Sequence, residues 1–269
     1  MSAGATAGLS PSPDGWVPDA GICVPVLDER QSVAPILAEI AAALRGGRYT
    51  ICVVDDGSQD GTVEIVRLAA ERDARIVLLQ RPRRGRGCRR GGASRAGLEW
   101  LLAHTDHGVF VDFDADGANE PGELAAGIRQ VAVLGADVAV ASKYLPGSRV
   151  TDRPWLRRLA SRAYSALLRL LISPRIRDYS NSYRFYSRQA AHLLFQFQPR
   201  YESPVYMVEM MAAWLAQGLR VVELPTAYGS RRGGESKVAL RDFVSGLVGA
   251  LRVGWLYRRG RYRIRARTS

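Results

Sequence analysis

Residues 51–62 read ICVVDDGSQDGT, an apolar run that ends in two carboxylates and a glycine. The pattern predicts a β-strand, a tight turn at Gly57 and a helix that begins near Asp60. Carboxylates that end a strand lie at the carboxyl edge of the sheet, where open α/β sheets bind ligands. A strand end followed by a capped helix has the same local pattern, so this stretch alone leaves both interpretations open.

A second acidic strand end follows further along the chain. The run GVFV at 108–111 is followed by Asp112-Phe113-Asp114-Ala115-Asp116-Gly117. Alternate carboxylates in an extended segment project from one side, where they can hold a hard cation such as Mg²⁺ or Mn²⁺. An isolated pair of this kind can also be a solvated acidic turn. Two acidic strand ends in one chain predict a shared site for a cation and a nucleotide, and therefore an enzyme.

Short apolar runs alternate with helix-like segments from residue 21 onward. Strands are predicted at 21–26, 50–54, 75–79, 108–112, 137–142, 183–187 and 219–224. Helices are predicted at 30–45, 60–72, 93–103, 120–134, 153–172, 204–217 and 238–258. This alternation predicts an α/β fold with a mostly parallel central sheet and helices on both faces.

The predicted domain organisation is simple. Residues 21–237 form one Rossmann-like domain, after a leader at 1–20 that is rich in Ala, Gly, Ser and Pro and predicted to be disordered. The helix at 238–258 is amphipathic and can lie on a membrane surface, and 259–269 is a basic tail.

The chain is strongly basic, with a formal net charge of +12. This charge predicts an anionic partner: nucleic acid, anionic lipid headgroups or a phosphorylated substrate. No apolar run reaches the ~20 residues that span a bilayer. The three cysteines show no C-x-x-C spacing, which argues against a zinc or redox site and is typical of the reducing cytoplasm.

Beyond the two acidic strand ends, four segments share a pattern with one enzyme family. They are Val24-Pro25-Val26-Leu27-Asp28-Glu29-Arg30, Ala141-Ser142-Lys143-Tyr144, Asp178-Tyr179-Ser180-Asn181-Ser182-Tyr183-Arg184 and Arg231-Arg232-Gly233-Gly234-Glu235-Ser236-Lys237. With these motifs the chain resembles the family 2 glycosyltransferases of GT-A fold over about residues 21–240, and especially the dolichol-phosphate and polyprenol-phosphate mannose synthases.

The resemblance implies roles for individual residues. The implied nucleotide-binding residues are Pro25, Leu27, Glu29, Val54, Asp55, Asp56, Ala115 and Lys237. The implied catalytic residues are Asp114, Asp116, Lys143 and Arg231, of which Asp114 and Asp116 also bind the metal.

The chain departs from the family pattern in several places, among them Ser182 in a divergent version of the family's D-x-T-S-G-F-R motif. Leu27 stands where the family often has Tyr, Asp28 where it has Asn, and Lys143 where it has a phosphate-binding Arg. Ala118 occupies a position that often carries Gln or Ser and has no ligand atom to offer. An unusual donor or acceptor is compatible with these departures.

The resemblance implies a metal-dependent, inverting transfer of mannose from GDP-mannose to a polyprenyl phosphate at the cytoplasmic membrane face, with Mg²⁺ or Mn²⁺ as cofactor. The partners are then a nucleotide sugar, the lipid phosphate and an anionic membrane surface, with no nucleic acid. Transfer from UDP-glucose or another nucleotide sugar to a different lipid or a soluble acceptor is a competing interpretation. Two more interpretations stay open: a non-catalytic nucleic-acid-binding protein, and a degenerate transferase that serves only as a binding subunit.

Overall fold

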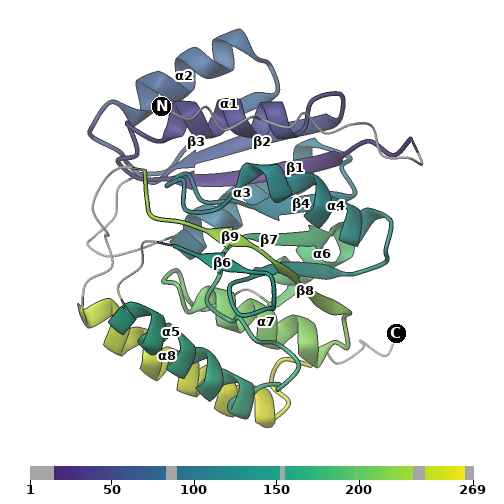
Figure 1. Ribbon diagram of the computed structural model, residues 1–269, viewed down its shortest axis with the longest axis vertical. Coiled ribbons are helices and arrows are strands. Elements are labelled where there is room, and N and C mark those ends of the chain that lie inside the picture. Colours follow the sequence, from purple (N-terminus) through teal and green to yellow (C-terminus); the bar gives the residue numbers. More distant parts are fainter. Residues whose placement is uncertain (1–14, 83–89, 152–154, 198, 233–239, 264–269) are drawn as a thin grey trace.

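The computed structural model describes residues 15–82, 90–151, 155–197, 199–232 and 240–263. Within these ranges a seven-stranded sheet has the spatial order β3-β2-β1-β4-β7-β5-β8 (Figure 1). Its strands are β1 (Asp19–Val26), β2 (Arg48–Asp55), β3 (Ile76–Gln80), β4 (Val109–Asp112), β5 (Val138–Ser142), β7 (Arg184–Ser187) and β8 (Val221–Pro225).

The sheet is mixed, because β7 runs antiparallel to both of its neighbours, β4 and β5. All the other neighbouring strands are parallel. A separate pair, β6 (Arg149–Val150) and β9 (Ala227–Tyr228), was not predicted. The predicted mostly parallel α/β sheet is confirmed.

Helices cover both faces of the sheet (Figure 1). They are α1 (Val33–Ala43), α2 (Thr62–Arg72), α3 (Arg90–His104), α4 (Leu124–Ala132), α5 (Trp155–Leu171), α6 (Arg188–Phe197), α7 (Tyr206–Ala216) and α8 (Leu240–Arg258), with a 3₁₀ turn η1 (Pro121–Glu123) before α4.

The two faces carry separate cores, and β1 shows why its sequence is apolar throughout. Ile22 and Val24 face the core that includes Ile36 of α1, whereas Cys23 between them faces the core that includes Leu98 of α3. Successive side chains of a strand point to opposite faces, so a strand covered on both sides lacks polar alternation.

The helix predicted to begin at residue 93 already begins at Arg90, as α3. A Cβ atom on Gly91 would lie 2.6 Å from Cγ of Tyr206, and one on Gly92 would lie 2.8 Å from a guanidinium nitrogen of Arg81. The Gly91 amide also donates to the carbonyl of Glu202 at 2.8 Å. Gly91 and Gly92 are therefore required by close packing at the start of the helix. Local sequence rules instead treat glycines in a helix pattern as unfavourable.

Three further elements differ from the predictions. Helix α6 was missed; it follows β7 directly, and the Ser187 hydroxyl accepts the Ala190 amide at 3.1 Å. The helix predicted at 120–134 is divided into η1 and α4. Strand β1 begins at Asp19, inside the predicted leader, and pairs there with Arg48 of β2.

Helices α5 and α8 lie side by side below the sheet (Figure 1). Gly254 of α8 permits this contact, since a Cβ there would lie 2.7 Å from Cβ of Leu171. The Arg258 guanidinium donates to the carbonyls of Leu170 and Leu171 at the end of α5, at 2.6 and 3.1 Å. None of the helices in the described ranges has the length and hydropathy to cross a bilayer.

Candidate active site

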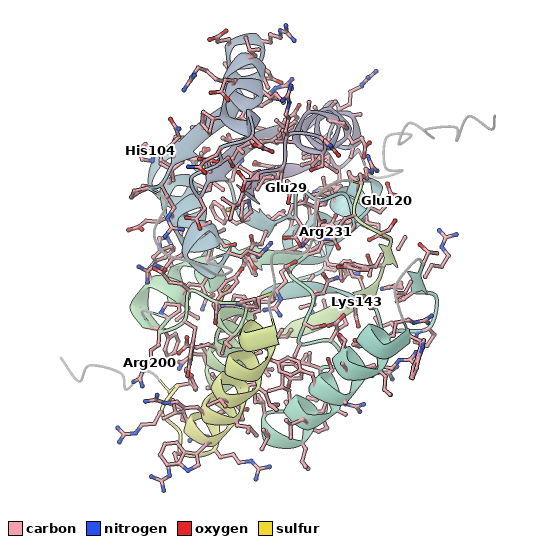
Figure 2. The ribbon with its side chains drawn as sticks, turned by 90° about the vertical axis from the view of Figure 1, so that its left-hand side faces the viewer. Glu29, His104, Glu120, Lys143, Arg200 and Arg231 are labelled. Atoms are coloured by element: carbon pink, nitrogen blue, oxygen red, sulfur yellow. The ribbon has the colours of Figure 1, made fainter. Side chains whose placement is uncertain are left out.

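The segments that follow β1, β2 and β4 meet at one edge of the sheet. Val26 is aligned with Asp55 and Cys23 with Asp112, and both pairings are parallel. The carboxyl ends of the three strands are therefore neighbours, as the two acidic strand ends predict. Figure 2 shows Glu29, Arg231 and Lys143 along the middle of the face turned to the viewer.

The two carboxylates at the end of β2 have different roles. Asp55 accepts the backbone amides of Gly57, at 3.0 Å, and Ser58, at 3.1 Å, so it closes the turn after the strand. Asp56 accepts a hydrogen bond from the Arg81 guanidinium at 2.9 Å. Of the two carboxylates predicted to bind nucleotide, Asp55 therefore forms the turn, and Asp56 is paired with the Arg81 guanidinium at the carboxyl edge of the sheet.

The loop after β1 is tied to the loop after β2. Asp28 has a φ of +51°, and its carboxylate accepts the Gln59 amide at 2.7 Å while its own amide donates to Ser58 Oγ at 2.8 Å. Asn and Asp both tolerate this left-handed conformation, because their short polar side chains can bond locally. Asp28 can therefore replace Asn without disturbing the loop that carries Glu29.

The remaining residues predicted to bind nucleotide are of two kinds. Pro25 and Leu27 are half-buried beside the site, whereas the side chains of Val54 and Ala115 belong to the two cores. Only the backbone of Val54 and Ala115 is left to serve a ligand. Lys237 lies outside the described residues.

Asp114 is held from both sides. Its Oδ1 accepts the Arg90 Nε at 2.6 Å, and its Oδ2 accepts the Ser182 hydroxyl and, at 3.4 Å, the Asn119 amide. Burial raises the pKa of Asp114, but the Arg90 charge and these hydrogen bonds outweigh it, so that the pKa lies below its ordinary value. Asp114 is therefore ionised and oriented.

Asp116 has the opposite balance. Burial, and next the Asp114 charge, raise the pKa of Asp116 to about 6, against the lowering effect of Arg231 and of the Ala118 amide. The Arg231 Nε lies 3.1 Å from Asp116 Oδ2, and the Arg232 amide donates to the Asp116 carbonyl at 2.9 Å. A second cation beside Asp116 would relieve its repulsion from Asp114.

Arg231 bridges two predicted parts of the site. Besides Asp116 it reaches Glu29, with 3.8 Å between its terminal nitrogen and Oε1. The segment at 229–232 runs alongside the segment that follows β4, since the Gly229 amide donates to the Ala118 carbonyl at 2.8 Å. The structure thus brings Glu29, Asp116 and Arg231 together, although they are far apart in the sequence.

Lys143, at the end of β5, is almost fully buried. Its Nζ lies 3.3 Å from Asp178 Oδ2 and 4.9 Å from the ring centroid of Tyr228. The Asp178 carboxylate also accepts the amides of Ser180 and Asn181, at 2.8 and 3.0 Å, so it shapes the loop that carries Ser182 to Asp114.

A pocket of about 180 Å³ opens beside Lys143, with a wall formed by α5. Its lining residues are Lys143, Tyr144, Leu145, Ser148, Val150, Arg158 and Arg162. Three of the seven are basic and none is acidic, so the pocket is suited to an anion. Arg158 and Arg162 were not predicted as site residues; their i, i+4 spacing on an amphipathic helix was the available signal.

The residues present fit a hard divalent cation. Asp114 and Asp116 supply carboxylate oxygens, and Asn119 Oδ1 is buried without a hydrogen-bond partner among the described residues. The described residues contain no cluster of three or more His, Cys, Asp or Glu side chains that would complete a protein-only metal site. Mg²⁺ and Mn²⁺ commonly fill the rest of their shell with water and phosphate oxygens, so this donor set suits a cation that binds together with a diphosphate.

Comparison with known proteins agrees with this geometry. The model of the family described as glycosyl transferase family 2 matches residues 21–195. The chain is 31% identical over 221 residues to a polyprenol monophosphomannose synthase of Mycolicibacterium smegmatis, covering 81% of this chain and 80% of the relative. It is 29% identical over 226 residues to an undecaprenyl-phosphate mannosyltransferase of Micrococcus luteus, covering 84% of this chain and 88% of the relative.

A solved structure shares the fold. Glucosyl-3-phosphoglycerate synthase of Mycobacterium tuberculosis, in complex with Mn²⁺, UDP-glucose and phosphoglyceric acid, superposes with a TM-score of 0.62 at 15% identity, covering 89% of this chain and 79% of that chain. The same enzyme has been solved with Mg²⁺ and UDP. The sheet, the family match and the relatives together show that the chain belongs to glycosyltransferase family 2, as a sugar-transferring enzyme of GT-A fold.

Proposed function

We propose that the enzyme transfers mannose from GDP-mannose to a polyprenyl phosphate, with inversion at the anomeric carbon. The position of the basic pocket is the observation that supports a lipid phosphate as the acceptor. The pocket lies between Lys143 and helix α5, and that helix also carries exposed apolar side chains. A phosphate in this pocket would have its chain beside an apolar helix face.

That apolar surface is shared with α8. Seven of the eleven large hydrophobic side chains that are exposed among the described residues belong to these two helices. They are Trp155, Leu159, Leu170, Leu247, Val248, Leu251 and Trp255, which we call the α5–α8 face. On α5 the intervals are four and eleven residues; on α8, Leu247, Leu251 and Trp255 are four residues apart and Val248 is next to Leu247, so the side chains share one side of each helix.

Charge favours a membrane as the occupant of the α5–α8 face. The basic side chains of Arg158, Arg169 and Arg259 are exposed on the same two helices or directly after them. The Arg259 guanidinium lies 3.9 Å from the ring centroid of Trp255. Tryptophan and arginine next to aliphatic side chains are typical of helices that lie at the interface of anionic bilayers. Peripheral binding to the membrane that holds the acceptor belongs to the proposal.

The chemistry follows from the charges in the site. An oxygen of the acceptor phosphate attacks the anomeric carbon, and the bond from that carbon to the nucleoside diphosphate breaks. The phosphate is already anionic, so no general base is required. In this proposal Arg231 stabilises the departing diphosphate and Asp114 orients sugar hydroxyls. When bound, Mg²⁺ or Mn²⁺ would be held by Asp114 and Asp116 and would neutralise part of the leaving-group charge.

The experiment compares donors and acceptors directly. Labelled GDP-mannose, GDP-glucose and UDP-glucose are each incubated with undecaprenyl phosphate or 3-phosphoglycerate, with Mn²⁺ or with EDTA. We expect label to enter the organic phase only with GDP-mannose, the lipid and Mn²⁺. Label that enters only a water-soluble product, or transfer from UDP-glucose alone, would contradict the proposal.

A second arm tests the basic pocket. Replacing both Arg158 and Arg162 by Ala is expected to raise the KM for the lipid phosphate by ~tenfold or more, because each lost charge-assisted contact weakens phosphate binding. The matched control is Arg67→Ala on α2, an exposed arginine away from the pocket. An unchanged KM in the double variant would place the acceptor phosphate elsewhere.

A further inference from the structure

Arg90 is a largely buried arginine that was not predicted as a site residue. It is the first residue of α3, and its side chain is 14% exposed. Its Nε donates to Asp114 at 2.6 Å, and a terminal nitrogen donates to the hydroxyls of Tyr206, at 2.9 Å, and Ser94, at 3.2 Å. The guanidinium thus sits directly behind one of the two carboxylates of the cation site.

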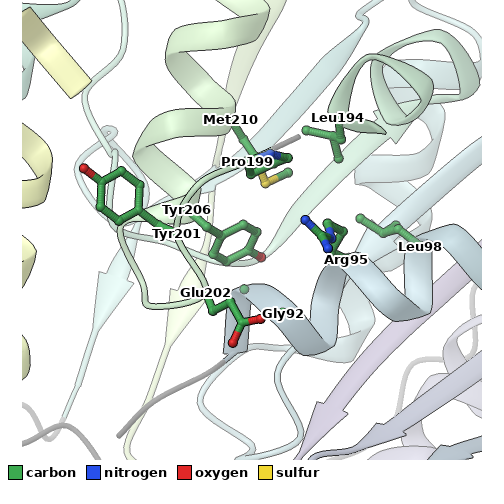
Figure 3. Close-up of a pocket in the computed structure, with 10 residues that line it drawn as sticks. Gly92, Arg95, Leu98, Leu194, Pro199, Tyr201, Glu202, Tyr206 and Met210 are labelled. Carbon is green, nitrogen blue, oxygen red and sulfur yellow. The ribbon is translucent and has the colours of Figure 1, made fainter. Parts of the chain in front are cut away.

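Asp112 holds Arg90 in this position. The Asp112 carboxylate has no exposed surface and lies 3.5 Å from both terminal nitrogens of Arg90. It also accepts hydrogen bonds from Ser94, at 2.9 Å, and from Tyr206. Figure 3 shows Tyr206 and Glu202 beside Gly92 at the start of α3. The pocket drawn there, which Tyr206 lines, has only about 10 Å³ of free space, about the room for one water.

The two arginines of the cation site differ in how firmly they are held. Arg231 is 37% exposed and lies in a loop at the protein surface, so an arriving cation can displace it from Asp116. Arg90 is inside the protein, with Asp112 on its far side. Arg90 is shared between Asp112 and Asp114, and Arg231 between Asp116 and Glu29, so the two arginines offset only part of the negative charge at the site.

We propose that Arg90 is a positioning residue that makes cation binding depend on the nucleoside diphosphate. The inference rests on the proposed function, which supplies the cation and the nucleotide. Arg90 takes one oxygen of Asp114 and places a fixed positive charge beside the site, which repels a divalent cation. A bound diphosphate adds negative charge and oxygen ligands, and these offset the repulsion.

The test separates this role from that of a core ion pair. In the double variant Arg90→Leu/Asp112→Asn, one positive and one negative charge are removed together, and the Asn oxygen can still accept from Ser94 or Tyr206. Buried ion pairs often tolerate such joint replacement, whereas removing one partner is costly. Asp112→Asn alone is the matched control, because it changes the support of Arg90 but leaves its charge in place.

The readout is the binding of Mn²⁺ alone, measured by electron paramagnetic resonance of the free ion, with and without GDP or UDP against nucleotide-only blanks. In the wild-type protein we expect binding at least ten times tighter with nucleotide. In the double variant we expect Mn²⁺ alone to bind at least ten times tighter than it does to the wild type. Adding Asp114→Asn to the double variant should abolish that gain.

A folded double variant whose Kd for Mn²⁺ alone stays within threefold of the wild type would overturn the inference. If the double variant does not fold, Arg90→Gln/Asp112→Asn takes its place, since it removes the same two charges and keeps a hydrogen-bond donor; the same comparison then decides. Unchanged Mn²⁺ binding together with normal sugar transfer would overturn only the role of Arg90. If the wild-type protein bound Mn²⁺ under neither condition, the cation requirement of the proposed function would fall as well.

Discussion

The Nζ of Lys143 lies 3.3 Å from Oδ2 of Asp178, and the same oxygen accepts the Lys143 amide at 3.0 Å. Burial raises the pKa of Asp178, but the Lys143 charge and the backbone amides outweigh it, so that the pKa lies below its ordinary value. The Asp178 carboxylate is therefore ionised at neutral pH. Asp178 fixes the lysine at the wall of the basic pocket.

Asp178→Asn is expected to lower the free energy of unfolding by ~3 kcal/mol, because it leaves a buried lysine without its counter-charge. Since the folded-state pKa of Asp178 is lowered, its contribution is present above the unfolded value of 3.8 and is lost as the pH falls through the folded value. Urea unfolding at pH 7 and at pH 3 measures the difference. The control Lys143→Met/Asp178→Asn should recover part of the stability without recovering acceptor binding. A single variant as stable as the wild type at pH 7 would contradict this role.

Trp155→Ser/Trp255→Ser is expected to reduce binding to anionic vesicles several-fold, because it removes two aromatic anchors of the α5–α8 face. Co-sedimentation with vesicles that contain phosphatidylglycerol, at low and high salt, measures this binding. Leu68→Ser is the control, since Leu68 is 51% exposed but lies on α2. Equal loss of binding in the control, or none in the double variant, would argue against this face.

Asp116→Asn is expected to stabilise the metal-free protein at pH 8 while it abolishes cation-dependent transfer. The folded-state pKa of Asp116 is raised from 3.8 to about 6. The favourable contribution of a raised acidic group is complete below the unfolded pKa and is lost as the pH rises through the folded one, so ionised Asp116 costs ~2–3 kcal/mol above pH 6.

Thermal unfolding in EDTA at pH 4 and pH 8 tests the Asp116→Asn prediction. The stabilisation should be large at pH 8 and small at pH 4. Equal stabilisation at both pH values would mean that the electrostatic strain at Asp116 is not its source.

Gly127→Ala in α4 is expected to destabilise the fold by at least ~2 kcal/mol through overpacking. A Cβ at this position would lie 2.0 Å from Cζ of Phe185 in β7, in the middle of the core. The matched control is Gly246→Ala in α8, where a Cβ would meet nothing within 4 Å. The control should gain ~0.5–1 kcal/mol from helix propensity. Thermal unfolding measures both, and a stable Gly127→Ala variant would contradict this packing of α4 on β7.

Local patterns predicted most elements because each pattern is set by residues that are close in the chain. The strand that ends at Asp55 and the one that ends at Asp112 are where their apolar runs place them. The antiparallel direction of β7 could not be predicted, since an apolar strand has the same alternation in either direction. The start of α3 was missed because Gly91 and Gly92 are required by contacts with Tyr206 and Arg81, which lie outside the helix.

The sequence by itself determined that this is an α/β enzyme with carboxylates at the carboxyl edge of its sheet, because strand, turn and helix signals act over a few neighbouring residues. Only the tertiary structure decided which basic side chains lie next to those carboxylates. Arg90 reaches Asp114 from the start of α3, Arg231 reaches Asp116 from the loop after β9, and Arg158 of α5 lines the pocket of Lys143. These contacts join distant parts of the chain, and they exist only because the packing of helices on both faces of the sheet brings those parts together.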